Sequence, residues 1–155
     1  MPVLESSLDL ACSPDALFEF FLLPANLLKV SPPDLHVKLV EAPNRLELGS
    51  RVTIVGRRWG IAQRMTTEVI TLDLARTLTD EQRDGPFRAF RHARTFSPRG
   101  TGVTLMERIE FEAPGGLVGL MITAARIQES LMELGAYRFQ ALQSIFDPSS
   151  PAVSG

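Results

Sequence analysis

Four alternating residues between positions 90 and 96 combine side chains that could do chemistry: Phe90, His92, Arg94 and Phe96. In an extended chain, alternate side chains point to the same face. The imidazole of His92 can exchange protons near neutral pH, and the guanidinium of Arg94 can meet an anionic or carbonyl group. A packed core would not choose the two middle residues, and a solvated face would not choose the outer two. The pattern is typical of a half-apolar cavity wall in which a few polar groups orient a ligand.

The next extended run places Glu107 and Phe111 on one face. If the chain turns at Ser97-Pro98-Arg99-Gly100, Arg94 and Glu107 lie on adjacent strands. They would then form a salt bridge inside the cavity, or Arg94 would contact the ligand instead. His92 has the same two interpretations, either a hydrogen bond to a neighbouring strand or a role as ligand-orienting group or general acid/base.

Four further residues are candidates for lining the cavity. Arg138 lies on the apolar stripe of a C-terminal helix, where an arginine either reaches the rim or contacts a ligand. Gln82 precedes a turn at Asp84-Gly85-Pro86, and Gln63 shares a face with Trp59. Either glutamine could line the cavity or satisfy backbone groups.

Several kinds of site lack support in the sequence. Cys12 is the only cysteine and His36 stands alone, so we expect no metal site and no internal disulfide. There is no Gly-x-Ser-x-Gly elbow of a hydrolase. Gly115-Gly116 is interpreted as a turn rather than a phosphate site, and we expect no cofactor.

The elements that must position these residues begin with a strand over Pro2 to Cys12. Ser13-Pro14-Asp15 is a strong helix start, and the helix ends at Pro24, with a second helical turn to about Val30. A long helix is predicted from Leu117 to about Phe146. The intervening extended runs are Leu35 to Glu41, Ser50 to Arg58, Trp59 to Asp73, Arg76 to Arg83, Phe87 to Phe96 and Val103 to Glu112.

Short turns between these runs imply antiparallel neighbours. A single long helix must be covered, and a strongly curved sheet that wraps around it does so. The sequence therefore predicts an α+β fold, a curved antiparallel sheet around a long C-terminal helix, with two short helices after the first strand. We expect one domain over residues 1–146 and a disordered tail over residues 147–155.

The composition of the chain argues against some classes of binding partner. The chain has 155 residues, 45% of them hydrophobic, and a formal net charge of −2, which leaves no basic footprint for nucleic acid. The longest uncharged apolar run, Ala113 to Ala125, is too short to span a bilayer. Because no signal peptide is visible and only one cysteine is present, we expect a cytoplasmic protein.

The order of elements and its motifs resemble the START/SRPBCC superfamily, which has the helix-grip fold, over the chain to about Phe146. The bacterial cyclase/dehydrase-like branch is the most similar, because a glutamine precedes a Gly-Pro-Phe turn and an aromatic-x-His-x-His-x-Phe strand follows. The corresponding residues are Gln82, Gly85-Pro86-Phe87, Phe90, His92, Arg94 and Phe96, then Glu107, Phe111, Pro114-Gly115-Gly116 and Tyr137-Arg138. Phe90 replaces the usual tryptophan, and Arg94 replaces the usual second histidine.

Three functions follow. The resemblance implies a cavity for a hydrophobic or aromatic small molecule, such as a lipid or a polyketide-like compound. It also allows a polyketide cyclase or dehydratase in which His92 is the base and Glu107 or Arg94 assists. A third interpretation is a homodimer or other protein contact through a second apolar side of the long helix, formed by Val118, Ile122, Ala125, Met132, Ala136 and Phe139.

Overall fold

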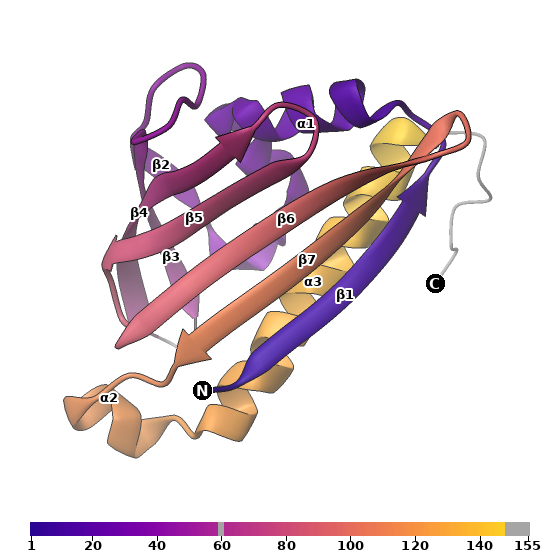
Figure 1. Cartoon of the computed structure of the whole chain (residues 1–155). Coiled ribbons are helices and arrows are strands. Elements are labelled where there is room, and N and C mark those ends of the chain that lie inside the picture. The colour runs from indigo at the N-terminus through magenta and orange to yellow at the C-terminus, as the bar shows by residue number, and fades with distance from the viewer. Residues whose placement is uncertain (59–60, 148–155) are drawn as a thin grey trace.

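The computed structural model describes residues 1–58 and 61–147 and contains seven strands, three α-helices and two short 3-10 helices in that part of the chain (Figure 1). The N-terminal half runs β1 Val3–Leu10, α1 Pro14–Leu22, η1 Pro24–Val30, η2 Pro33–Leu35, β2 Lys38–Glu41 and β3 Arg51–Arg58. The remainder is β4 Ile61–Asp73, β5 Thr77–Asp84, β6 Ala89–Arg99, β7 Gly102–Glu112, α2 Gly116–Met121 and α3 Ala124–Phe146.

The strands form one antiparallel sheet in the order β1-β7-β6-β5-β4-β3-β2. Each strand from β2 to β7 pairs with its neighbour in sequence, as short connections require, and β1 closes the edge by pairing with β7. Register shifts in the β2–β3 and β4–β5 pairs add local bends to the strands. The sheet curves around α3, which runs along its inner face (Figure 1). The predicted α+β helix-grip fold is confirmed.

Alternation along β7 builds the core. Its inward residues Val103 and Leu105 join one apolar cluster with α1 and the C-terminal end of α3, and Ile109 and Phe111 join a second cluster near the start of α3. Glu107 points inward between them and is 2% exposed. The inner face therefore has a polar layer between two apolar clusters, and the candidate site lies in this layer.

The start of α1 and the long C-terminal helix ending at Phe146 are confirmed, but the predicted start of that helix is wrong. Ser13 caps α1 by accepting a hydrogen bond from the backbone N–H of Ala16, and Pro14 occupies the first turn. The predicted single helix from Leu117 is instead broken into α2 and α3. Thr123 accepts from the N–H of Arg126 and begins α3 as a new helix, since a capping hydroxyl satisfies a donor that an unbroken helix would use internally.

Two other boundaries differ from the sequence prediction. The strand predicted from Leu35 begins only at Lys38, because η2 takes up Leu35 and His36 adopts a left-handed conformation. The turn predicted at Ser97–Gly100 lies further along, since β6 continues to Arg99 and Gly100 supplies the positive φ of the hairpin. Trp59 and most of the predicted tail, residues 148–155, lie outside the described residues.

None of the helices in the described part of the chain has both the length and the apolar character needed to cross a bilayer.

Candidate functional site

A cavity of about 290 Å³ lies between the inner face of the sheet, η1 and α3. Its walls are largely apolar and include Val30, Ile54, Met65, Ile109, Leu131 and Leu134. Four ionisable side chains also reach it: Asp80, His92, Arg94 and Arg138. The cavity therefore combines apolar walls with one polar region, which is the usual composition of a small-molecule site.

Arg138 and Glu107 join α3 to β7 through a two-pronged contact. Arg138 Nε donates to Glu107 Oε1 at 2.7 Å, and Arg138 Nη2 donates to Glu107 Oε2. The side chain of Glu107 is 1% exposed and that of Arg138 is 15% exposed. The carboxylate is buried, and this bidentate ion pair offsets the free-energy cost of removing its charge from water.

His92 lies between Glu107 and Arg94 and contacts both. Its Nε2 lies 2.6 Å from Glu107 Oε2, and its Nδ1 lies 3.1 Å from Arg94 Nη2. A guanidinium can only donate, so Nδ1 must accept from Arg94 and the ring proton must be on Nε2, which donates to Glu107. The contacts alone thus assign the tautomer of a neutral imidazole.

Arg94 is paired with Asp80 rather than with Glu107. Arg94 and Glu107 are opposed in the β6–β7 register, but Arg94 Nη1 donates to Asp80 Oδ1 at 2.7 Å across to β5. The guanidinium carbon lies 5.3 Å from the centre of the Phe21 ring, within cation–π range. The predicted Arg94–Glu107 salt bridge is therefore absent. Arg138 reaches Glu107 from α3, and Arg94 pairs with Asp80 instead.

The electrostatics of the layer keep His92 neutral and Glu107 ionised. Burial lowers the pKa of His92, the positive charge of Arg94 lowers it further, and the contact with Glu107 opposes both only in part. Burial alone would raise the pKa of Glu107, but the positive charge of Arg138 and the hydrogen bond from His92 hold that pKa well below its usual range.

The structure brings together some of the residues singled out from sequence and separates others. Phe90, His92, Arg94 and Arg138 line the cavity, and Glu107 lies directly behind them. Phe96 and Phe111 are fully buried in the two apolar clusters.

The two glutamines do not line the cavity. The side-chain amide of Gln82 binds both backbone groups of Phe87, at 2.7 Å to the carbonyl oxygen and 3.3 Å from the N–H. Gln63 is half-buried and belongs to β4.

Sequence reasoning missed Asp80 as a site residue, although it shares a strand face with Leu78 and Gln82. Its pairing with Arg94 depends on the β5–β6 register, in which Asp80 lies opposite His92. The sequence did contain a signal for Asp80, because an acidic residue two positions before Gln82 lies on the same strand face. Phe21, which the sequence analysis did not single out, lines the cavity and also packs on the first apolar cluster.

No group of three or more His, Cys, Asp or Glu side chains placed to hold a metal ion occurs within residues 1–58 and 61–147.

The fold and this site define a helix-grip protein of the START/SRPBCC superfamily, a class of hydrophobic ligand-binding folds. A family model described as polyketide cyclase / dehydrase and lipid transport matches residues 1–143, and the chain belongs to this family. The resemblance stated from the sequence motifs is thus confirmed. None of the curated proteins compared with the chain matches it.

Solved structures share the fold at low sequence identity. CV1439 from Chromobacterium violaceum is similar with a TM-score of 0.75 and 15% identity, covering 96% of this chain and 99% of that one. TTHA0849 from Thermus thermophilus has a TM-score of 0.73 and 17% identity with the same coverage. Major latex-like protein 151 from Panax ginseng has a TM-score of 0.63 and 16% identity, covering 89% of this chain and 95% of that one.

Proposed function

We propose that the protein binds a hydrophobic or aromatic small molecule, a lipid or a polyketide-like compound, in the cavity between the curved sheet and α3. The observation that carries this proposal is the cavity itself, about 290 Å³ of space with apolar walls and one polar region. Each 100 Å² of apolar ligand surface buried there contributes about 2.5 kcal/mol to binding. The walls thus supply affinity, and the polar region supplies orientation.

Two atoms of the polar region, besides the buried and unpartnered Arg94 Nε, are available to orient a ligand. Arg138 uses Nε and Nη2 for Glu107, and no described residue bonds to its Nη1. Asp80 uses Oδ1 for Arg94, and no described residue bonds to its Oδ2. Arg138 Nη1 and Asp80 Oδ2 are thus one donor and one acceptor, which suit a ligand with a carbonyl and a hydroxyl group. Phe90, His92 and Arg94 complete the wall around them.

A cyclase or dehydratase that uses His92 as acid/base is the alternative. Both ring nitrogens of His92 are engaged, one by Glu107 and one by Arg94. Catalysis would require His92 to give up one of these hydrogen bonds before it could move a substrate proton. Binding requires no such rearrangement, and we therefore propose binding rather than turnover.

Among the described side chains of the second apolar side, Ile122 is buried, Phe139 packs on the main cluster and Met132 is exposed. We propose a protein whose principal partner is a small molecule rather than a nucleic acid or a second subunit. A cytoplasmic location remains part of the proposal, in keeping with a single half-buried cysteine.

A pair of tryptophan substitutions on α3 tests the binding proposal. Leu134 lines the cavity, so Leu134→Trp fills part of it, whereas Met132 is 60% exposed and Met132→Trp leaves it open. Titration with the neutral fluorescent probe N-phenylnaphthylamine should show saturable binding to the unmodified protein and to Met132→Trp. Leu134→Trp should weaken that binding about tenfold or more. Equal binding by both variants would place the probe elsewhere and contradict the proposal.

A further inference from the structure

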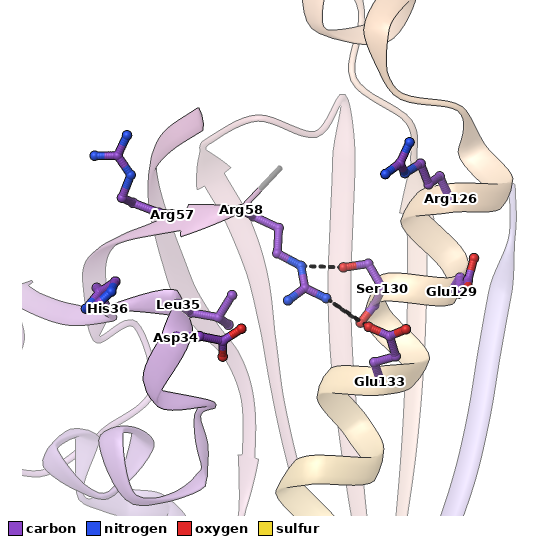
Figure 2. Close-up of a pocket in the computed structure, with 9 residues that line it drawn as sticks. All are labelled: Asp34, Leu35, His36, Arg57, Arg58, Arg126, Glu129, Ser130 and Glu133. Atoms are coloured by element: carbon purple, nitrogen blue, oxygen red, sulfur yellow. Dashed lines mark hydrogen bonds and ion pairs between the residues drawn. The ribbon is translucent and has the colours of Figure 1, made fainter. Parts of the chain in front are cut away.

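A second, larger hollow of about 590 Å³ opens next to the ligand cavity, and it is polar (Figure 2). We call it the mouth and define it by its lining residues: Asp34, Leu35, His36, Arg57, Arg58, Arg126, Glu129, Ser130 and Glu133. Leu35 borders both hollows, so the mouth and the ligand cavity adjoin. A molecule that filled the inner cavity and continued past Leu35 would reach the mouth.

Arg58 is held in a fixed orientation at the mouth. Its Nε donates to Ser130 Oγ at 2.5 Å and its Nη2 donates to the Ser130 carbonyl oxygen at 3.3 Å, joining the end of β3 to α3 (Figure 2). Ser130 is 6% exposed, so this anchor is shielded from water. No described residue bonds to Arg58 Nη1. A guanidinium already fixed by two contacts loses little conformational entropy when it binds a further group.

Arg126 adds a second positive charge on the same side of α3. It precedes Ser130 by four residues, so the two side chains share a helix face. Figure 2 shows the Arg126 guanidinium directed toward the side of α3 that faces Arg58, whereas the carboxylate of Glu129 points to the other side. Within the described part of the chain, Arg126 has no ion-pair partner, and it is exposed.

The mouth is lined by three arginines and three carboxylates, but in the described part of the chain none of these carboxylates forms a hydrogen bond to Arg58 or Arg126. Glu133 lies 3.6 Å from Arg58 Nη2 and its side chain is 67% exposed, so their ion pair is long and solvated. Exposed pairs of this kind contribute little to stability. An incoming anion that makes direct hydrogen bonds to Arg58 can displace Glu133 at little cost. Asp34 lies on η2, which the figure shows across the space from α3.

The inner cavity, by contrast, cannot accept a net negative charge. Arg94 is matched by Asp80, Arg138 is matched by Glu107, and His92 is neutral. An ionised ligand group placed there would be an additional buried charge without a counter-charge, which is strongly unfavourable. A ligand with one ionised end must therefore keep that end in the mouth.

We propose that the mouth binds the anionic oxygen group of an amphipathic ligand, a carboxylate, phosphate or sulfonate, between Arg58 and Arg126, while the apolar part of the ligand occupies the inner cavity. This inference rests on the proposed function and assigns it a class of ligand. The apolar contacts give most of the affinity, and the two arginines select molecules that carry a negative end.

Two fluorescent probes that share one aromatic skeleton test this. Anilinonaphthalene sulfonate carries a sulfonate and N-phenylnaphthylamine does not, so the ratio of their affinities measures the contribution of the anionic group. The unmodified protein should bind the sulfonate probe more tightly. Arg126→Gln should reduce affinity for the sulfonate probe about five- to tenfold and leave the neutral probe within about twofold. Arg58→Gln should also reduce the preference, and about 1 M salt should weaken it in the unmodified protein.

Arg99→Gln is the matched control, because Arg99 is an exposed arginine at the β6–β7 hairpin, far from the mouth (Figure 1). It should leave both affinities unchanged. Equal affinity for the two probes, or an equal effect of Arg126→Gln on both, would overturn the mouth proposal and leave the binding proposal standing. Benzenesulfonate binding as tightly as the full sulfonate probe would show that the mouth takes a free anion, and would overturn it too. Failure of both probes to bind would overturn both proposals.

Discussion

Arg138 on α3 and Glu107 on β7 form a two-pronged ion pair in the polar layer that separates the two apolar clusters of the core. The pair fixes the helix against the sheet at the depth where the ligand cavity lies. It also leaves Arg138 Nη1 available to the cavity, so one contact serves both the fold and the site. Both consequences can be measured separately.

Glu107→Gln should destabilise the protein by about 3 kcal/mol, because it leaves the positive charge of Arg138 without its partner. Glutamine keeps the shape of glutamate, so the loss reports charge rather than packing. Urea unfolding at neutral pH, followed by circular dichroism, measures the change. Glu112→Gln on the same strand is the control, since Glu112 is exposed, and it should change the free energy of unfolding by less than about 0.5 kcal/mol. Equal effects of the two substitutions would contradict a buried, paired Glu107.

The double variant Glu107→Met with Arg138→Met should regain most of the stability lost by Glu107→Gln. Replacing both members of a buried ion pair by apolar side chains removes the cost of keeping charges out of water, and the outcome is often neutral or stabilising. The same unfolding experiment compares the variants. A double variant as unstable as Glu107→Gln would indicate that the hydrogen bond from His92, rather than the charge pair, holds this layer together.

Stability should fall as the pH decreases below about 6.5, and His92 should account for part of the fall. The pKa of His92 is lowered in the folded protein, so the unfolded chain takes up a proton in this range before the folded protein does. Stability is therefore fully present above the unfolded pKa and declines below it, by up to about 1.4 kcal/mol per pH unit for one proton. Glu107, whose folded pKa is also lowered, adds its contribution below about pH 4.5.

His92→Gln should accordingly flatten the dependence of stability on pH between about 7 and 5. His36→Gln removes the other histidine, which is exposed, and should keep the steeper dependence of the unmodified protein. Denaturation curves at a series of pH values give the slopes. The same slope in all three proteins would show that His92 is not kept neutral by its surroundings.

Gln82→Ala should reduce stability by about 1 to 3 kcal/mol without changing ligand affinity. The amide of Gln82 binds the N–H and the carbonyl oxygen of Phe87, and alanine would leave both half-buried groups without partners. Gln63→Ala is the comparison, because Gln63 has no hydrogen-bond partner among the described side chains, and it should be nearly neutral. A loss of probe binding in Gln82→Ala at full stability would instead restore Gln82 as a ligand contact.

Much of the fold could be predicted because its signals are local. Ser13 followed by Pro14 identifies the start of α1, and alternating residues identify the strands. The break before α3 was missed because Thr123 lies inside an apolar run in which helical periodicity continues. Only the hydrogen bond from the Arg126 N–H to its hydroxyl distinguishes a cap from an interior threonine.

Sequence reasoning singled out several residues of the polar layer, missed Asp80, and did not predict how these residues pair. Alternation placed His92, Arg94 and Glu107 on inward faces, as the structure shows. Arg138 neutralises Glu107 because of the way α3 lies across the sheet. Asp80 neutralises Arg94 because of the β5–β6 register. Neither of these long-range relationships has a local signal in the sequence. The mouth was not foreseen, because it joins residues from η2, β3 and α3.

The most direct test of the ligand cavity is native mass spectrometry of the protein purified from its own host under gentle conditions. We predict an added mass that disappears on denaturation, that Leu134→Trp reduces or abolishes, and that Met132→Trp retains. A protein that carries no added mass and also binds no hydrophobic probe, or an added mass that Leu134→Trp leaves unchanged, would contradict a ligand held between the sheet and α3.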